Sequence, residues 1–216
     1  MFILFGVTLA ASFFWFLKPG RLDIFVSNSL SRTFHLNAKC SGVRIDRWPK
    51  IYFKSATIGR YDQSGMIRSG AGEVIIETSA NLFDIDVREV AIDANRWNLL
   101  KSMPWPEGFL KNGGFEIHRL HFLLKGRGAH KTIHVLTGNS DDFSIKGGGQ
   151  FLKQKITKGH LWVEMSPFVW KRLPEEFAKR MKKGRDDSRI FHLVFHENVI
   201  KLLGNYGPFF EARWQG

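Results

Sequence analysis

Residues 84–94, DIDVREVAIDA, carry the pattern that decides the fold class of this chain. Apolar Ile85 and Val87 alternate with polar residues, and Val90 and Ile92 resume the alternation after a slip of one position. A period of two is typical of a β-strand with one apolar face, and the slip indicates a bulge. This segment is therefore predicted to be a long, half-buried strand with a bulge near its middle.

The same period of two recurs on both sides of this segment and predicts about ten strands in all. Turn signals rich in Gly, Asn and Asp separate them. A mainly β fold follows, with a single antiparallel sheet in one domain at residues 18–216. The other expected strands are 43–46, 51–53, 73–77, 115–125, 132–137, 143–146, 161–165, 190–196 and 199–203, with turns at 62–65, 112–114, 138–140 and 147–149.

Two short helices are expected beside the sheet. Residues 23–32 have apolar side chains at helical spacing and would lie next to a membrane. In 174–183, proline and glutamates come first and basic residues last, as helix ends prefer. Leu173, Phe177 and Met181 would form its apolar stripe. We expect this second helix to cap the open end of the sheet.

The first 17 residues, MFILFGVTLAASFFWFL, contain no charge. As a helix they span roughly 25 Å, so a single transmembrane anchor is predicted. The rival interpretation is a signal peptide cleaved near Ala10–Ser12. Lys18 and Arg21 follow the segment, and the positive-inside rule would keep that side cytoplasmic. This conflicts with the periplasmic placement expected below, and the sequence leaves the conflict open.

The composition favours contact with anionic and apolar material. The net charge is +12, and the chain has 20 Phe and 7 Trp but only 3 Tyr. A basic excess attracts anionic surfaces, and Phe-rich chains favour dry aromatic contacts. Zinc-finger spacing, a helix-turn-helix signal and an RNP-type aromatic motif are all missing from the sequence, so nucleic acid is not an expected partner.

The histidines give no strong metal signal. His118 and His121 are three apart in one expected strand and should point to opposite faces. His192 and His196 share a face, but the residues between them are strand-like and include no glutamate. No metal site is expected, and a metal-dependent hydrolase using His192 and His196 is a distant alternative.

Other candidate chemistry is equally weak. Asp141–Asp142 and Asp186–Asp187 are typical of turns rather than of catalytic carboxylate pairs. Gly147–Gly149 does not lead into a helix, as a phosphate-binding loop would. Cys40 is the single cysteine, which excludes an intrachain disulfide, and no cysteine-nucleophile motif surrounds it. We expect neither catalytic residues nor a cofactor, and interpret the chain as non-enzymatic.

The N-terminal part has a recognisable order of motifs: the apolar segment, the helix through Arg32, Cys40–Ile45, Arg47–Pro49 and Ile51–Gly59, with a hairpin at 85–93. In this order it resembles the beginning of AsmA-like envelope proteins. The C-terminal half looks like the small type II secretion system protein N, through a Gly-rich strand at 145–151, a helix, and residues 191–214. The resemblance implies an inner-membrane anchor and a strongly curved periplasmic sheet with an apolar concave face.

Such a face could hold acyl chains, which makes phospholipid or another acyl-chain lipid the expected ligand. The expected function is lipid handling or transport, or outer-membrane maintenance. The alternative is an accessory component of a type II secretion apparatus, with secretion or envelope proteins as partners. Strand alternation also allows a closed barrel or sandwich core. The lipid-facing candidates are Ile75, Ile85, Val87, Phe115, Ile117, Leu123, Ile133, Val135, Leu193 and Phe195.

Overall fold

The described part of the chain begins after the apolar N-terminal segment. The predicted anchor at 1–17 and the expected turn residues 112–113 lie outside it. Among the described residues, no helix has both the length and the apolar character needed to cross a membrane. The computed structural model describes residues 20–34, 37–60, 63–77, 79–93, 114–127, 129–152, 155–197 and 199–213.

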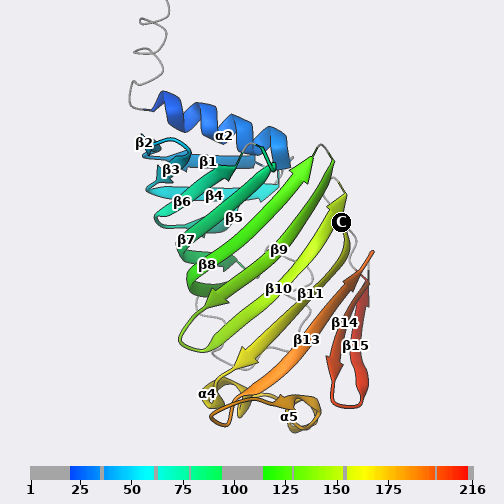
Figure 1. Cartoon of the computed structure of the whole chain (residues 1–216). Coiled ribbons are helices and arrows are strands. Elements are labelled where there is room, and N and C mark those ends of the chain that lie inside the picture. The colour runs from blue at the N-terminus through cyan, green and yellow to red at the C-terminus, as the bar shows by residue number, and fades with distance from the viewer. Residues whose placement is uncertain are drawn as a thin grey trace, which may run out of the picture.

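Strands of the described residues form one antiparallel, open sheet, which confirms the mainly β, antiparallel part of the predicted fold (Figure 1). The main path runs β1-β4-β5-β7-β8-β9-β10-β11-β13-β14-β15, while β6, β3 and β2 branch from β7, and β12 pairs with β13. The strands are β1 Asn37–Ser41, β2 Arg44–Arg47, β3 Lys50–Phe53, β4 Ser55–Arg60, β5 Gln63–Ser69, β6 Gly72–Glu77, β7 Leu82–Asp93, β8 Gly114–Arg127, β9 His130–Asn139, β10 Phe143–Leu152, β11 Lys155–Met165, β12 Lys182–Lys183, β13 Arg189–His196, β14 Val199–Gly204 and β15 Gly207–Arg213.

Helix α2, Arg21–Phe34, covers the β1 edge of the sheet and confirms the first predicted helix (Figure 1). Two N–H groups on the outer edge of β1, those of Ala38 and Cys40, donate to the hydroxyls of Ser31 and Ser27 at 3.0 and 2.8 Å. An uncovered edge strand exposes unpaired backbone groups that invite pairing with other chains. The helix therefore closes this edge with its own serines.

Two short helices, α4 Pro167–Trp170 and α5 Glu175–Arg180, lie at the other end of the molecule (Figure 1). Helix α5 confirms the second predicted helix, but it ends earlier than expected because Lys182–Lys183 pair with β13 as strand β12. The predicted stripe of Leu173, Phe177 and Met181 packs into the core cluster at this end. Helix α4 was not predicted from the sequence.

One expected turn is wrong, because Gly147–Gly149 lie inside β10. Two others are displaced: Gly138–Asn139 end β9, so only Ser140 of that expected turn lies in a turn, and Gln63–Gly65 begin β5, while Asp62 lies outside the described residues. Glycine runs are typical of turns, but glycine also occurs in strands where a neighbouring side chain needs the space. The turn between β9 and β10 falls instead at 140–142, and the amides of Asp142 and Phe143 donate to the Ser140 hydroxyl there at 3.1 and 3.3 Å.

The slip in 84–94 has a different cause from the bulge that was expected. Glu89 adopts a left-handed backbone conformation with φ of 52°. The register with β8 stays constant across it, since Arg88 pairs with Arg119 and Val90 with Ile117. The alternation therefore changes phase because β7 and β8 kink together at this position, and neither strand has an inserted residue.

The core consists of two adjoining clusters along one side of the sheet. The first gathers buried residues of β1 to β8, such as Ile85 and Ile117, and the inner side of α2 packs against it. The second gathers buried residues of β11 to β14 with the two short helices. Phe143 and Ile145 of β10 pack against both clusters, so the apolar side of the sheet is continuous.

Candidate functional site

On one face of the sheet, paired residues of neighbouring strands form rows that run across the strands. Every position in three of these rows is an apolar residue or a glycine. For example, Ile85 of β7 pairs with Phe122 of β8, and Leu161 of β11 pairs with Leu193 of β13. Following these pairs from β3 to β15 gives an unbroken row, which we name the middle row. Its members are Ile51, Val74, Ile85, Phe122, Leu136, Gly147, Leu161, Leu193, Leu202 and Phe210.

A flanking row lies on each side of the middle row, because side chains of one strand face the same side at every second residue. None of the positions in these three rows carries a polar or charged side chain. We name the three rows together the apolar face. The flanking rows are Phe53, Gly72, Val87, Leu120, Gly138, Ile145, Val163 and Phe191, and then Ile76, Phe83, Leu124, Ile133, Gly149, Gly159, Phe195 and Ile200.

A bulge in β9 keeps this strand in phase with its neighbours. Leu123 pairs with Val135 but Leu124 pairs with Ile133, so His134 is the extra residue. Ile133 and Leu136 therefore face the same side although they are three residues apart. Val135, between them, faces the opposite side and is 41% exposed.

Glycine at position 138 makes room for bulkier neighbours on the apolar face. A Cβ atom added to Gly138 would lie 2.8 Å from Cγ1 of Ile145 and 3.2 Å from Cδ1 of Leu120. These are the two residues that pair with Gly138 on the adjacent strands. The glycine thus lets two large aliphatic side chains approach each other across it, and the row stays apolar without a gap.

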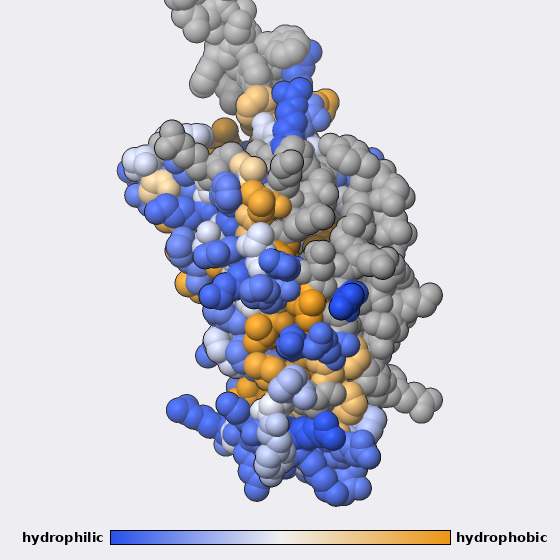
Figure 2. Space-filling view, turned by 90° about the vertical axis from the view of Figure 1, so that its right-hand side faces the viewer, coloured by the Kyte–Doolittle hydropathy of each residue, from blue (hydrophilic) through white to orange (hydrophobic). Residues whose placement is uncertain are grey.

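Many side chains of the apolar face stay partly exposed within the described part of the chain. In the middle row, Ile85 and Leu202 are buried, with 7% and 3% exposed, whereas the remaining side chains stay partly exposed. Figure 2 shows hydrophobic residues gathered across the middle of one side of the molecule, between more hydrophilic regions. Large apolar side chains in a closed core are mostly buried. The face therefore has the character of an open apolar surface.

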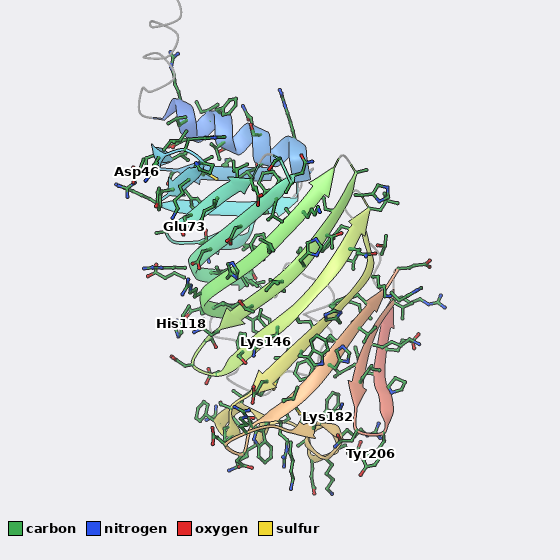
Figure 3. The ribbon with its side chains drawn as sticks, in the orientation of Figure 1. Asp46, Glu73, His118, Lys146, Lys182 and Tyr206 are labelled. Carbon is green, nitrogen blue, oxygen red and sulfur yellow. The ribbon has the colours of Figure 1, made fainter. Side chains whose placement is uncertain are left out.

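The opposite face of the sheet is mainly polar, although Ile75, Leu123, Val135 and Trp162 also lie on it. Glu73 of β6 and Lys146 of β10 mark it in Figure 3. On β8, Arg119 Nε donates to Asp86 Oδ2 at 2.7 Å, and His121 Nε2 lies 2.7 Å from Asp84 Oδ1. Charged and paired side chains of this kind suit a solvated surface. The sheet is thus amphipathic, with one face for apolar contact and one for water.

An aromatic stack stands on the polar face at β11 and β13. The Trp162 ring lies 4.5 Å from the His192 ring at an interplanar angle of 8°, and His160 lies 4.4 Å from Trp162 on β11. Burial lowers the pKa of His192, and the neighbouring His160 and Lys182 lower it further. These surroundings favour the neutral form of the His192 ring.

Of the ten residues predicted to face lipid, the structure places seven on the apolar side of the sheet. Five of them are in the rows of β7, β9 and β13, among them Phe195, which pairs with Gly159. Ile117 is buried in the first core cluster, and the Phe115 ring meets the Phe143 ring edge-on at 6.1 Å. The seven are Ile85, Val87, Phe115, Ile117, Ile133, Leu193 and Phe195.

The other three predicted residues, Ile75, Leu123 and Val135, lie on the polar face, because each alternates with a residue of the apolar rows. Sequence reasoning also missed most of the middle row. The residues not predicted are Ile51, Val74, Phe122, Leu136, Gly147, Leu161, Leu202 and Phe210. Their apolar alternation on β3, β6, β11 and β14 was visible, but only the strand register shows that they form one row.

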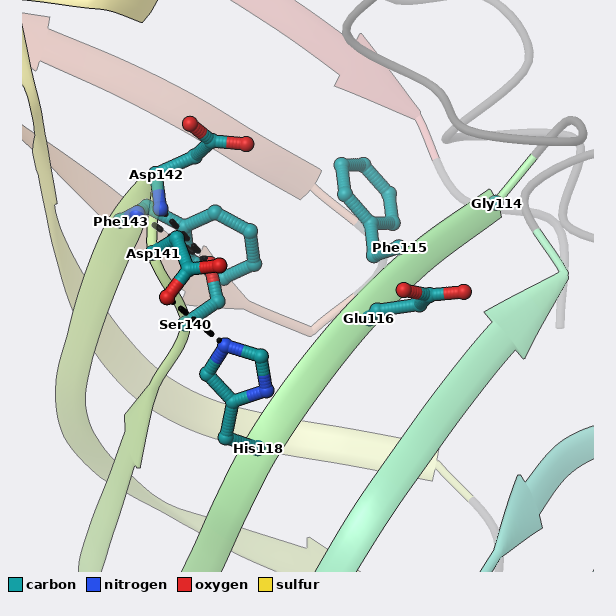
Figure 4. A pocket seen from close by; sticks show the side chains of 8 residues that line it. All are labelled: Gly114, Phe115, Glu116, His118, Ser140, Asp141, Asp142 and Phe143. Carbon is teal, nitrogen blue, oxygen red and sulfur yellow. Dashed lines mark hydrogen bonds and ion pairs between the residues drawn. The ribbon is translucent and has the colours of Figure 1, made fainter.

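The small hollow between β8 and the β9–β10 turn offers little room for a substrate (Figure 4). Its volume is about 30 Å³, enough for only a few water molecules. His118 Nε2 contacts Asp141 Oδ1 there at 3.0 Å, and both side chains are largely exposed. The Ser140 hydroxyl accepts two backbone N–H groups and holds the turn. The hollow is a structural feature of this turn.

The remaining candidate groups are structural as well. Among the described residues, no group of three or more His, Cys, Asp or Glu side chains is arranged to hold a metal ion. Asp186 and Asp187 occupy a turn with left-handed φ of 50° and 58°. Burial, with the nearby charge of Asp23, raises the pKa of Cys40 to about 11 although a hydrogen bond with Ser27 opposes this shift. Such a thiol is a weak nucleophile at neutral pH.

Comparison with known proteins gives no relative, since no protein-family model, curated protein or solved structure matches the chain.

Proposed function

We propose that this chain is a non-enzymatic, membrane-anchored envelope protein that binds acyl chains of phospholipid or a similar lipid on its apolar face. The middle row supports this proposal most directly. It crosses ten strands without a polar side chain, and most of its members are partly exposed. An apolar surface left in water forfeits about 25 cal/mol per Å², so an apolar ligand completes the fold.

The dimensions of the face suit lipid tails. Ten strands at a spacing of ~4.8 Å extend over about 43 Å. One leaflet of a bilayer is roughly 15 Å thick in its hydrocarbon part, so the face has room for more than one acyl chain. Burying about ten methylene groups contributes roughly 8 kcal/mol, enough to offset a substantial part of the cost of association.

The cellular setting of the proposal comes from the sequence. The uncharged segment at 1–17 serves as a single-pass anchor in the inner membrane, and the sheet lies in the periplasm. The resemblance to AsmA-like proteins supports lipid handling or transport, or maintenance of the outer membrane, as the role. Lys18 and Arg21 oppose this orientation, so a reporter fused to the C-terminus is part of the test.

A second candidate is an accessory role in a type II secretion apparatus, and the β15 edge favours it. In the described residues, β15 pairs only with β14, whereas the β1 edge is covered by α2. An open edge can accept a strand from a partner protein. In this alternative, the chain binds a secretion protein through β15 and the apolar face forms part of that interface.

Native mass spectrometry with lipid extraction tests the first proposal, on the full chain purified from the envelope in mild detergent. Leu136→Asp places a charge on the apolar face, and Val135→Asp places the same charge on the polar face of the same strand. We expect co-purifying phospholipid with wild type and Val135→Asp, and its loss with Leu136→Asp.

Circular dichroism checks that both variants are folded, and Leu136→Gln provides a milder change if the aspartate variant unfolds. A folded, lipid-free wild-type chain would remove the lipid proposal. Stable co-purification of that chain with secretion proteins would then favour the second candidate.

A further inference from the structure

Helix α2 has a second apolar spot on its outer side. Its inner side, Leu22, Val26 and Leu30, packs against the first core cluster. Ile24 and Phe25 point elsewhere, and their side chains are 63% and 54% exposed. A helix that covers a sheet edge normally presents polar residues to water. Two adjacent large apolar residues on the outer side therefore indicate an additional contact surface.

The β2–β3 hairpin adds exposed apolar residues at the same end of the molecule. Trp48 at its tip is 61% exposed, and Ile45 on β2 is 41% exposed. Of nine large hydrophobic residues that are exposed in the described chain, four thus lie within residues 24–48. Tryptophan is the residue that prefers the boundary between a membrane and water.

Contacts of Asp23 join the helix to the hairpin. Its carboxylate accepts the N–H groups of Gly42 and Val43 at 3.0 and 2.7 Å, directly before β2 begins. Figure 1 shows β2 and β3 beside the first turns of α2. The exposed residues of the helix and of the hairpin are therefore held at one end of the sheet.

This end of the chain is basic. Residues 20–54 contain seven Lys or Arg and two Asp. Both acidic side chains are engaged within the protein, because Asp23 holds the backbone of Gly42 and Val43 and Asp46 lies 3.5 Å from Arg44. The remaining positive charge, including that of Arg47 next to Trp48, attracts the anionic headgroups of a membrane surface.

We propose that α2 and the β2–β3 hairpin form a foot that rests in the headgroup layer of an anionic bilayer. Ile24, Phe25 and Trp48 enter the interface, while Arg47 and Lys50 contact lipid phosphates. The uncharged segment at 1–17 ends only three residues before α2 begins, which brings this surface to the membrane. This proposal depends on the N-terminal anchor of the proposed function. With the foot in the headgroup layer, the sheet extends away from the bilayer and β15 lies at the far end.

Site-directed spin labelling tests the foot on the full chain in vesicles of phosphatidylcholine and phosphatidylglycerol. The label is attached at Trp48→Cys and, as the matched control, at Tyr206→Cys, both with Cys40→Ala. Tyr206 is 90% exposed and lies at the opposite end of the molecule (Figure 3). Power saturation with oxygen and with a water-soluble nickel complex reports the depth of each label. We expect the label at 48 at headgroup depth and the label at 206 in water.

A charge-reversal variant separates the foot from the anchor. Adding Arg47→Glu and Lys50→Glu is expected to raise nickel accessibility at position 48 toward that at 206, while the chain still floats with the vesicles. Equal accessibility at 48 and 206 in a chain that floats overturns the foot and leaves the anchor standing. A full chain that does not float with vesicles overturns the anchor, and the foot with it.

Discussion

Alanine substitutions at two leucines of the middle row measure directly how open the apolar face is. Leu202 is buried, with 3% exposed, whereas Leu136 is partly exposed. Replacing a buried leucine costs the transfer of the lost methylenes plus the cavity that remains, about 3 kcal/mol in most cores. At Leu136, part of the side chain already contacts water and no closed cavity is left, so we expect a cost of about 1 kcal/mol.

Urea denaturation followed by far-UV circular dichroism gives both values, from the midpoint and the slope of each transition. The informative quantity is the difference between the two variants, about 2 kcal/mol, because the substitution and the secondary structure are the same. Equal losses of about 3 kcal/mol at both positions would refute the open face and indicate a closed core. Added lipid should raise the cost at Leu136, since the ligand then buries that side chain.

Three further predictions concern other parts of the structure. Asp23→Ala removes the acceptor of the Gly42 and Val43 N–H groups and is expected to lower the free energy of unfolding by about 2 kcal/mol in the same urea assay. Cys40, with its pKa raised to about 11, should react with iodoacetamide at about pH 8 at least roughly 100-fold more slowly than free cysteine, as mass spectrometry can measure. Because the pKa of His192 is lowered in the folded chain, the unfolded chain binds a proton at this ring more readily. The stability that the neutral ring allows is therefore fully present above pH 6.5 and is lost as the pH falls from there through the lower pKa of the folded state. Thermal melts at about pH 7 and about pH 5 should therefore show a smaller loss for His192→Phe than for wild type, and an equal loss would contradict the shift.

Alternation of apolar and polar residues was enough to predict the fold class and most of the strands from β6 to β14. It failed for β1, β4, β5 and β15, which are short or rich in small and polar residues. It also failed at Gly147–Gly149, because a glycine run is typical of turns, whereas β10 uses these positions inside the sheet. How much space a neighbouring strand requires depends on the tertiary structure, and the local sequence does not indicate it.

The sequence predicted which strands have an apolar side, but not which residues together form the apolar face. Strict alternation groups Ile133 with Val135, yet the bulge at His134 sends them to opposite faces. On β8, Ile117 and Leu123 have the same parity, but the kink shared with Glu89 changes the phase between them. Bulges and kinks depend on pairing with a partner strand. The sequence thus indicates which strands have an apolar side, and only the register shows which residues share it.

Photocrosslinking along β8 is the most direct test of lipid binding on the apolar face. A benzophenone amino acid is placed at Phe122, which lies in the middle row, or at Leu123, the next residue, which faces the polar side. After irradiation of envelope preparations, mass spectrometry detects acyl-chain adducts. We predict adducts at position 122 and their near absence at 123. Equal labelling at the two positions, or no lipid adduct at 122 in a folded protein, would contradict the proposal that this face binds acyl chains.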